Sequence, residues 1–272
     1  MNRFVLTGLV VVAIGASCTT QRRAGKSSLD QFEKVSTGRP AGRVITPVNQ
    51  ILTPAGLQVP LPGMRPQALA LRPDGRLLAT SGKTHELVLV DPATGAIVDR
   101  VPLPSEAATN AVEIVSTHIL TPDDKGQLSY TGLIFSRDGR RIYLSNVNGS
   151  IKVFELNEEG KYVGRFSIPL PKTGLPLRQA EIPSGLALSG DGQRLFVALN
   201  LSNRLLELDA ETGSEIRAFD CGVAPYDVVW KGNKAYVSNW GGRRPEEGSV
   251  TGPAGRGTFV RVDSVRHVAS EG

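Results

Sequence analysis

The sequence predicts an all-β fold assembled from repeated antiparallel sheets, and two observations lead to this fold class. Apolar and polar residues alternate over short runs, and no stretch sustains the 3.6-residue period of an amphipathic helix. Thirty glycines and 18 prolines are spread along the 272 residues, a distribution typical of many short strands joined by tight turns. These features disfavour an α/β arrangement.

One pattern recurs four times: an alternating run, a tight turn, and a second run that ends in small or polar residues. The segments that carry it are 67–82, 131–146, 184–199 and 226–239. Asp-Gly forms the turn in the first three copies and Gly232-Asn233 in the fourth, because hairpin turns need a positive φ that glycine adopts readily. The turn glycines are Gly75, Gly139, Gly192 and Gly232, and the last two lie 40 residues apart, about the length of one propeller blade.

Two further strands follow each complete copy. Third strands are expected at 87–91, 151–155 and 205–209, and fourth strands near 96–103, 162–170 and 214–220. Four antiparallel strands per repeat predict a β-propeller with about four blades, near 67–103, 130–170, 184–220 and 226–272. The fourth copy lacks its outer strands. Residues 51–61 are predicted to form an outer strand of a further blade that is missing. We therefore expect an incomplete ring within a partial propeller over 51–272.

The first 18 residues predict an export signal. Asn2 and Arg3 precede an apolar run over 4–14, and small residues at 15–18 suit cleavage. The pattern is similar to a bacterial lipoprotein signal, in which Cys18 would become the lipidated residue, although Gly15 stands where leucine is usual. Lipidation at Cys18 and simple cleavage nearby both stay open. Residues 19–50 are expected to form a flexible tether, and the protein to be periplasmic or membrane-anchored.

The positive charge of the chain belongs mostly to its beginning. The formal net charge is +5, and seven basic residues lie within the first 43: Arg3, Arg22, Arg23, Lys26, Lys34, Arg39 and Arg43. The remainder is close to neutral and has no basic stripe interleaved with aromatic residues. Nucleic acid is therefore not expected as a partner.

No motif predicts catalysis, a metal or a cofactor. The three histidines His85, His118 and His267 lack the spacing of zinc ligands, and no C-x-x-C-H haem motif is present. The chain also has no G-x-S-x-G nucleophile elbow. Only Cys221 accompanies Cys18, so no internal disulfide is expected. We expect no catalytic residue, no metal and no cofactor in this chain.

The repeat resembles the YVTN-type repeat of bacterial propellers. Tyr143-Leu-Ser-Asn146 and Tyr236-Val-Ser-Asn239 are close to the family tetrapeptide, and the resemblance covers about residues 51–272. Segments 53–61 and 237–245 are also similar to a narrower group, in which such a propeller precedes a phosphoesterase domain of the alkaline-phosphatase superfamily. This resemblance implies an exported protein with a C-terminal phosphoesterase domain that is missing from the chain.

Candidate ligand-binding residues lie where each first strand begins and each second strand ends, since these loops share one face around the central channel. They are Gln67, Thr131, Asn146, Ser184, Asn200, Tyr226, Asn239 and Trp240. Amides and hydroxyls beside an indole suit a small polar ligand or a peptide. The same side chains can instead bond to the loop backbone.

Two insertions, 104–129 and 240–257, are long for propeller connections, and long loops often carry function. The second contains Arg243, Arg244 and Arg256 near Trp240. Guanidinium groups and an indole can grip an anionic or aromatic partner. An exposed loop without a partner is the alternative.

Two functions compete on this evidence. The first is an exported, non-catalytic binding scaffold, the accessory part of a phosphoesterase fusion. The second is a propeller hydrolase of the lactonase type acting on a sugar lactone, since such propellers resemble this repeat in length. A lactonase would need His, Glu or Arg at the channel mouth, and the eight candidate positions offer none. The sequence therefore favours the scaffold.

Overall fold

The computed structural model describes residues 44–45, 51–52, 56–107, 109, 123–266 and 268–269, and its elements in these ranges are all β-strands. The chain divides into two units, 1–57 and 58–272. In the first unit, β1 (Val44–Ile45) pairs antiparallel with β2 (Ile51–Leu52). The predicted leader lies outside the described residues. Within the ranges just given, no helix has the length and apolar character that crossing a membrane requires.

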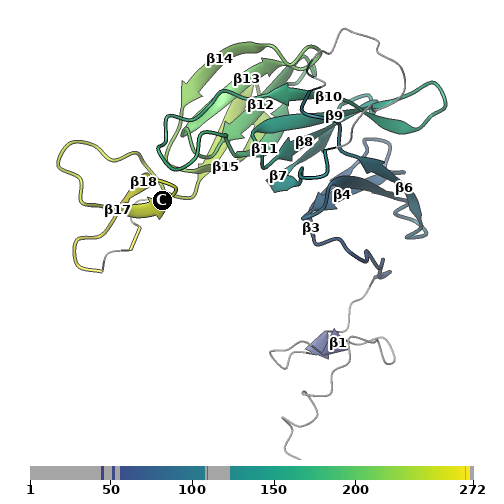
Figure 1. The fold of residues 1–272 in the computed structure, drawn as a ribbon, viewed down its shortest axis with the longest axis horizontal. Helices are drawn as coiled ribbons and strands as arrows, with labels where there is room; N and C mark the ends of the chain where they lie inside the picture. Colours follow the sequence, from purple (N-terminus) through teal and green to yellow (C-terminus); the bar gives the residue numbers. More distant parts are fainter. Residues whose placement is uncertain are drawn as a thin grey trace, which may run out of the picture. The chain divides into compact units, whose positions relative to one another are not determined.

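The second unit contains three four-stranded antiparallel sheets, each with its strands in chain order (Figure 1). Blade 1 consists of β3 (Pro66–Leu71), β4 (Leu78–Gly82), β5 (Glu86–Val90) and β6 (Ile97–Pro102). Blade 2 consists of β7 (Leu128–Phe135), β8 (Arg141–Asn146), β9 (Ser150–Leu156) and β10 (Tyr162–Pro169). Blade 3 consists of β11 (Pro183–Leu188), β12 (Arg194–Leu199), β13 (Arg204–Asp209) and β14 (Glu215–Asp220).

The fourth copy of the repeat forms only half a blade. β15 (Pro225–Lys231) pairs with β16 (Lys234–Asn239), while β17 (Thr251–Gly255) and β18 (Thr258–Arg261) form a separate hairpin. The predicted fold class is therefore confirmed: an all-β propeller of four-stranded antiparallel blades whose ring is not closed.

The Asp-Gly turns fold as the sequence predicts. In blade 2, Gly139 has φ +69°, a left-handed conformation that glycine adopts without steric cost. Beside it, the Asp138 carboxylate accepts hydrogen bonds from the Arg140 N–H (3.0 Å) and the Ser136 hydroxyl (2.6 Å). The aspartate thus satisfies backbone that a two-residue turn leaves unpaired.

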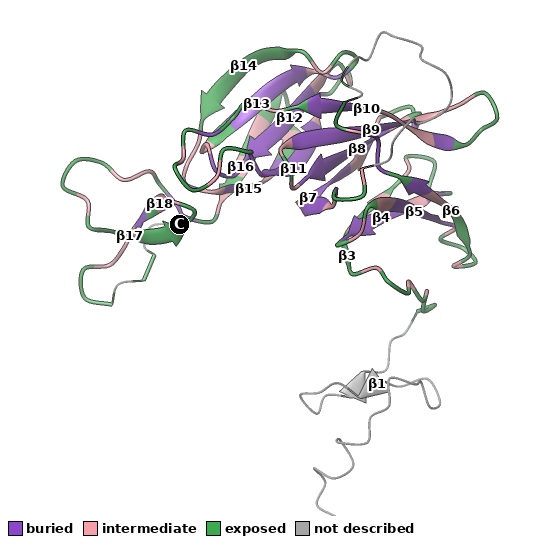
Figure 2. Ribbon diagram, in the orientation of Figure 1, coloured by how far each residue is buried: buried purple, intermediate pink, exposed green. Residues whose placement is uncertain are grey.

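The core lies between neighbouring blades, where their sheets pack face to face. The first strands lie side by side in the order β3, β7, β11, β15. Figure 2 shows that β8, β9, β12 and β13 are mostly buried, whereas β14 is exposed along its whole length. The apolar cluster between blades 3 and 4 has the fewest buried members, because blade 4 supplies only two strands to it.

The terminal blades leave apolar side chains in water. On blade 4, Val229 is 57% and Tyr236 55% exposed, and on blade 1, Leu69 is 65% exposed. Val229 and Tyr236 are cross-strand partners, so they share the face that points away from blade 3. In a closed ring that face would be covered by the next blade.

The first strands approach each other so closely that one position on β7 has no room for a side chain. Ser145 Oγ donates a 2.6 Å hydrogen bond to the Ser184 carbonyl, which joins blade 2 to blade 3. A Cβ placed on Gly132 would lie 1.9 Å from Ser145 Oγ and 2.1 Å from that carbonyl oxygen. Glycine at 132 is therefore a requirement of the seam between the two blades.

We predict that Gly132→Ala destabilises the protein by about 1–3 kcal/mol, because the added methyl overpacks a seam that includes rigid backbone. Gly174→Ala is the matched control, since a Cβ there meets nothing within 4 Å. Urea unfolding of both variants measures the difference. Equal midpoints for the two variants would contradict the assignment of a tight seam.

Candidate functional site

Two of the predicted channel-mouth residues come together, and a third ring that the sequence did not single out joins them. The rings of Tyr226 and Trp240 stack with centroids 4.2 Å apart and an interplanar angle of 17°. Tyr130 packs edge-on against both, at 5.5 Å from Tyr226 and 5.4 Å from Trp240. We call these three residues the aromatic cluster. It joins the first strand of blade 2 to the first strand of blade 4 and the loop after β16.

Irregular backbone positions these rings. Tyr130 has φ +53° and lies where the register of β7 against β8 shifts between Leu128 and Leu133. Tyr226 lies at a similar shift in β15, between Pro225 and Asp227. Such bulges re-aim a side chain away from the regular alternation of a strand. The alternation pattern alone therefore could not show that Tyr130 faces the same cluster as Tyr226.

The aromatic cluster combines an exposed aromatic face with nearby positive charge. Trp240 is 60% exposed although one face of its indole is covered by Tyr226. Burial raises the pKa of the Tyr130 hydroxyl, while the positive charges of Arg256 and Arg178 act in the opposite direction. Positive charge that acts on this cluster favours an anionic ligand. Of the two guanidinium groups, that of Arg178 already donates to the Ala180 and Val147 carbonyls.

Two buried hydroxyls flank Tyr130 in the chain. Ser129 Oγ and Thr131 Oγ1 are shielded from solvent and have no hydrogen-bond partner among the described residues. A hydroxyl carries one donor and two acceptor sites, and buried ones are usually paired. Thr131, a predicted site residue, therefore has a hydroxyl that is buried without a partner among the described residues.

Three other predicted residues serve the backbone instead. Ser184 is buried, and its hydroxyl donates to the Pro225 carbonyl at 2.9 Å. Asn200 Nδ2 donates to the same carbonyl at 3.0 Å, and Asn146 Oδ1 accepts from the Gln127 N–H at 3.1 Å. The bonds of Ser184 and Asn200 join blade 3 to blade 4, whereas that of Asn146 lies within blade 2. Bonding to loop backbone is the second role that the sequence left open. Asn146 Nδ2 also donates to the side chains of Glu106 and Ser150.

The remaining two candidates at the channel mouth are Gln67 and Asn239. Gln67 is exposed on β3. Asn239 Nδ2 has a long contact of 3.4 Å with the Val237 carbonyl, and its Oδ1 is buried without a partner in the described part of the chain.

The three arginines of the second insertion have different environments. Arg244 fastens the insertion to blade 3: its Nε donates to the Cys221 carbonyl at 2.7 Å, and its Nη2 contacts Asp220 Oδ1 at 3.2 Å. Arg243 is exposed. Arg256 is exposed at the turn between β17 and β18, and it is the one of the three whose charge affects Tyr130.

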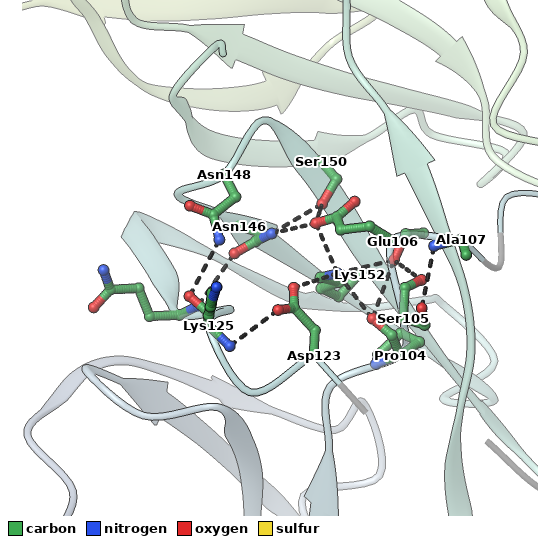
Figure 3. Close-up of polar contacts among 12 residues, drawn as sticks. Pro104, Ser105, Glu106, Ala107, Asp123, Lys125, Asn146, Asn148, Ser150 and Lys152 are labelled. Carbon is green, nitrogen blue, oxygen red and sulfur yellow. Dashed lines mark hydrogen bonds and ion pairs between the residues drawn. The ribbon is translucent and has the colours of Figure 1, made fainter. Parts of the chain in front are cut away.

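A second polar centre, which sequence reasoning missed, surrounds a buried lysine (Figure 3). Lys152 on β9 is 0% exposed, and its ammonium lies 2.8 Å from the Pro104 carbonyl and 2.8 Å from Glu106 Oε1. It also contacts Ser167 Oγ at 3.0 Å and Asp123 Oδ2 at 2.9 Å. A buried ammonium requires such partners, because desolvation alone costs several kcal/mol.

This lysine anchors the first insertion. Glu106 lies before, and Asp123 after, the part of the insertion that is not described, so one side chain of blade 2 holds both flanks. Burial alone would raise the pKa of the Asp123 carboxyl. The Lys152 ammonium and two backbone N–H groups outweigh burial and hold that pKa below its usual range. The sequence did contain a signal for this buried lysine. In the run Ile151-Lys-Val-Phe154, Lys152 lies two residues before Phe154, so both side chains lie on the same face of the strand, the face of a core phenylalanine.

The described residues contain no group of three or more His, Cys, Asp and Glu side chains arranged to hold a metal ion. In the polar centre, the Lys152 ammonium forms ion pairs with Glu106 and Asp123.

Comparison with known proteins finds likeness only among solved structures. No protein-family model matches the chain. No curated protein matches it either. Hydrazine synthase of Kuenenia stuttgartiensis is 14% identical with a TM-score of 0.47, over 64% of this chain and 56% of that chain. The Cps50 (Swd1) β-propeller domain of Myceliophteria thermophila is 12% identical with a TM-score of 0.46, over 65% and 48%.

The WD40 repeats of RRP9 give similar values: 11% identity and a TM-score of 0.47, over 63% of this chain and 43% of that chain. The chain thus spans about half the length of the solved structures that it matches. At this level of likeness the assignment rests on the molecule's own sheets. By fold, the chain is a β-propeller of four-stranded antiparallel blades whose ring is not closed.

We predict that Lys152→Met destabilises the protein by about 3–5 kcal/mol, because it leaves the buried Asp123 carboxylate without its cation. Lys161→Met is the matched control: its ammonium is exposed and 3.8 Å from Glu159, and its loss should cost no more than about 0.5 kcal/mol. Chemical unfolding of both variants tests this. A Lys152→Met variant as stable as the control would show that the network adds nothing to the fold.

Proposed function

We propose that the chain is an exported, non-catalytic binding scaffold that binds a small ring-shaped anion at the aromatic cluster. The observation that carries the proposal is the aromatic cluster itself, in which Tyr226 stacks on one face of Trp240 while the Trp240 side chain stays 60% exposed. The positive charge of Arg256 acts on the same cluster.

The chemistry of the cluster favours a planar ligand. A ring lying on the exposed face of Trp240 would extend the stack that Tyr226 begins, and aromatic pairs contribute about 0.5–1.5 kcal/mol beyond their buried area. The nearby guanidinium groups favour a carboxylate or phosphate on that ring. Because two blades supply the rings, the blades must be packed before the site exists.

The proposal also includes a cellular place and a companion activity. The leader over 1–18 supports export, with the mature protein either periplasmic or lipid-anchored through Cys18. The resemblance over 53–61 and 237–245 supports association with a phosphoesterase domain, which would carry out hydrolysis while the propeller binds. A scaffold of this kind needs no catalytic group of its own.

We predict that phenyl phosphate binds the chain at least tenfold more tightly than phenol or inorganic phosphate does, because only phenyl phosphate combines ring and charge. Trp240→Ala should weaken phenyl phosphate at least tenfold, and Arg256→Gln should reduce its advantage over phenol. Titration calorimetry measures the affinities. Tyr236→Ala is the matched control, since it removes an exposed ring outside the aromatic cluster.

Equal weakening by Trp240→Ala and Tyr236→Ala would contradict the site. Hydrolysis of a sugar lactone by the purified chain above the buffer rate would contradict the non-catalytic part of the proposal and favour the lactonase-type alternative.

We predict that export removes the leader, so that mass spectrometry of bacterial envelope fractions finds a first residue at or near Cys18. A lipid-modified Cys18 would place the chain on the membrane, and Cys18→Ala would then release it. Chain recovered from the cytoplasm with its Met1 terminus intact would overturn the assignment of the leader.

A further inference from the structure

A groove of about 800 Å³ lies between blade 3 and the two strands of blade 4. Phe196 and Leu205 line it from blade 3, and Trp230 and Val237 line it from blade 4. The Phe196 and Trp230 rings stack at 4.8 Å and 16°, so part of the groove lining is already packed across the two blades. The groove is thus the open continuation of the apolar interface between these two blades.

In blades 2 and 3, the position that corresponds to the groove is filled by the third strand of the blade. Lys152 and Phe154 of β9 are cross-strand partners of Leu144 and Ile142, which pack in the cluster between blades 1 and 2. In blade 3, Leu206 and Leu208 of β13 pack into the cluster with blade 2. In both cases a third strand places two residues, at positions i and i+2, against the preceding blade. In the described part of the chain, β16 has no such strand beside it.

Charge adds a second constraint on the occupant. β8 begins with Arg141, paired across the sheet with Glu155 at 3.4 Å, and β12 begins with Arg194, whose partner Asp209 lies at 3.6 Å. β16 begins with Lys234, which is exposed and has no ion pair with any described residue. A strand beside β16 in the same register would therefore place its residue opposite Lys234, where an acidic side chain fits.

We propose that this groove binds a β-hairpin of another polypeptide, whose first strand pairs antiparallel with the free edge of β16. That strand carries large apolar residues opposite Ala235 and Val237 and an Asp or Glu opposite Lys234. Ala235 and Val237 are the cross-strand partners of Trp230 and Val228, so their face is the one that packs on blade 3. Main-chain bonds supply affinity and the alternate side chains supply specificity, as in other strand-addition interfaces.

The geometry favours a hairpin over a second copy of this chain. If β16 of two copies paired about a two-fold axis, both copies of blade 3 would lie on the same face of the joint sheet. In such a dimer, the strands that one copy adds beside β16 would have to lie under blade 3 of the other copy. That space is already occupied by β13 and β14 of each blade 3. A hairpin of two strands fills the groove without this conflict.

The test uses a labelled peptide of residues 204–220, which is the β13–β14 hairpin of the chain itself. Its Leu206, Leu208 and Asp209 have the required pattern. Fluorescence anisotropy with the full chain should show saturable binding. Serine at both leucine positions of the peptide should weaken binding at least about tenfold, because two large apolar side chains lose their burial.

Charge reversal locates the strand without risk to the fold, because Lys234 is exposed. Lys234→Glu should weaken the peptide by up to about fivefold, the effect of an exposed ion pair. An Asp209→Lys peptide should recover that loss. Lys231→Glu is the matched control, since Lys231 is the exposed partner of Lys234 on β15, away from the free edge.

A second measurement uses Cys221, which lines the groove and is the only thiol once Cys18→Ala is introduced. Bound peptide should slow its reaction with a maleimide. The proposal is overturned if a scrambled peptide binds as well, or if charge reversal gives loss without recovery. It is also overturned if sedimentation shows a dimer that the peptide does not dissociate, since a second copy would then occupy the groove.

Discussion

Face-to-face packing of neighbouring blades is the constraint on which this structure depends. A four-stranded sheet has two faces and cannot bury either one alone, so each blade needs the next. The hydrogen bond from Ser145 to the Ser184 carbonyl, and the space that Gly132 leaves for it, bring the first strands of blades 2 and 3 together. The bond from Ser184 to the Pro225 carbonyl repeats this link between blades 3 and 4. The apolar clusters follow from these contacts.

The contacts between blades also determine where the Lys152 centre and the aromatic cluster lie. Lys152 occupies a position that corresponds to Leu206 in the next blade, and it is tolerated there because two carboxylates and a carbonyl from the first insertion meet its ammonium. The insertion is therefore attached to the fold by charge where the other blades use apolar contact. The aromatic cluster depends on the seams in another way, since its rings come from blades 2 and 4.

Blade 4 has only two strands in its sheet, so its packing against neighbours is incomplete. Its β16 alternates between exposed and partly buried residues, while β8 and β12 are buried almost throughout. One face leaves Tyr236 in water, and the other opens into the groove beside Phe196. Exposed apolar surface and an unpaired strand edge in one place are features of a surface suited to a partner.

Much of the fold could be predicted from the sequence because its signals are local. Alternation of period two predicts strands, and Asp138-Gly139 predicts a hairpin turn, from neighbouring residues alone. Repetition of that unit predicts four-stranded blades and an incomplete ring. Export and the link to a phosphoesterase also come from the sequence, and they stay predictions.

The candidate site was decided mostly by tertiary structure. Tyr226 and Trp240 were predicted, but Tyr130 joins them only because a bulge in β7 redirects its ring. Ser184 was predicted to face a ligand, and the neighbouring blade buries it. The roles of Lys152, Glu106 and Asp123 depend on contacts between residues up to 48 positions apart. A side chain's neighbours, its burial and its charge partners are set by how blades pack, and no local pattern in the chain records that packing.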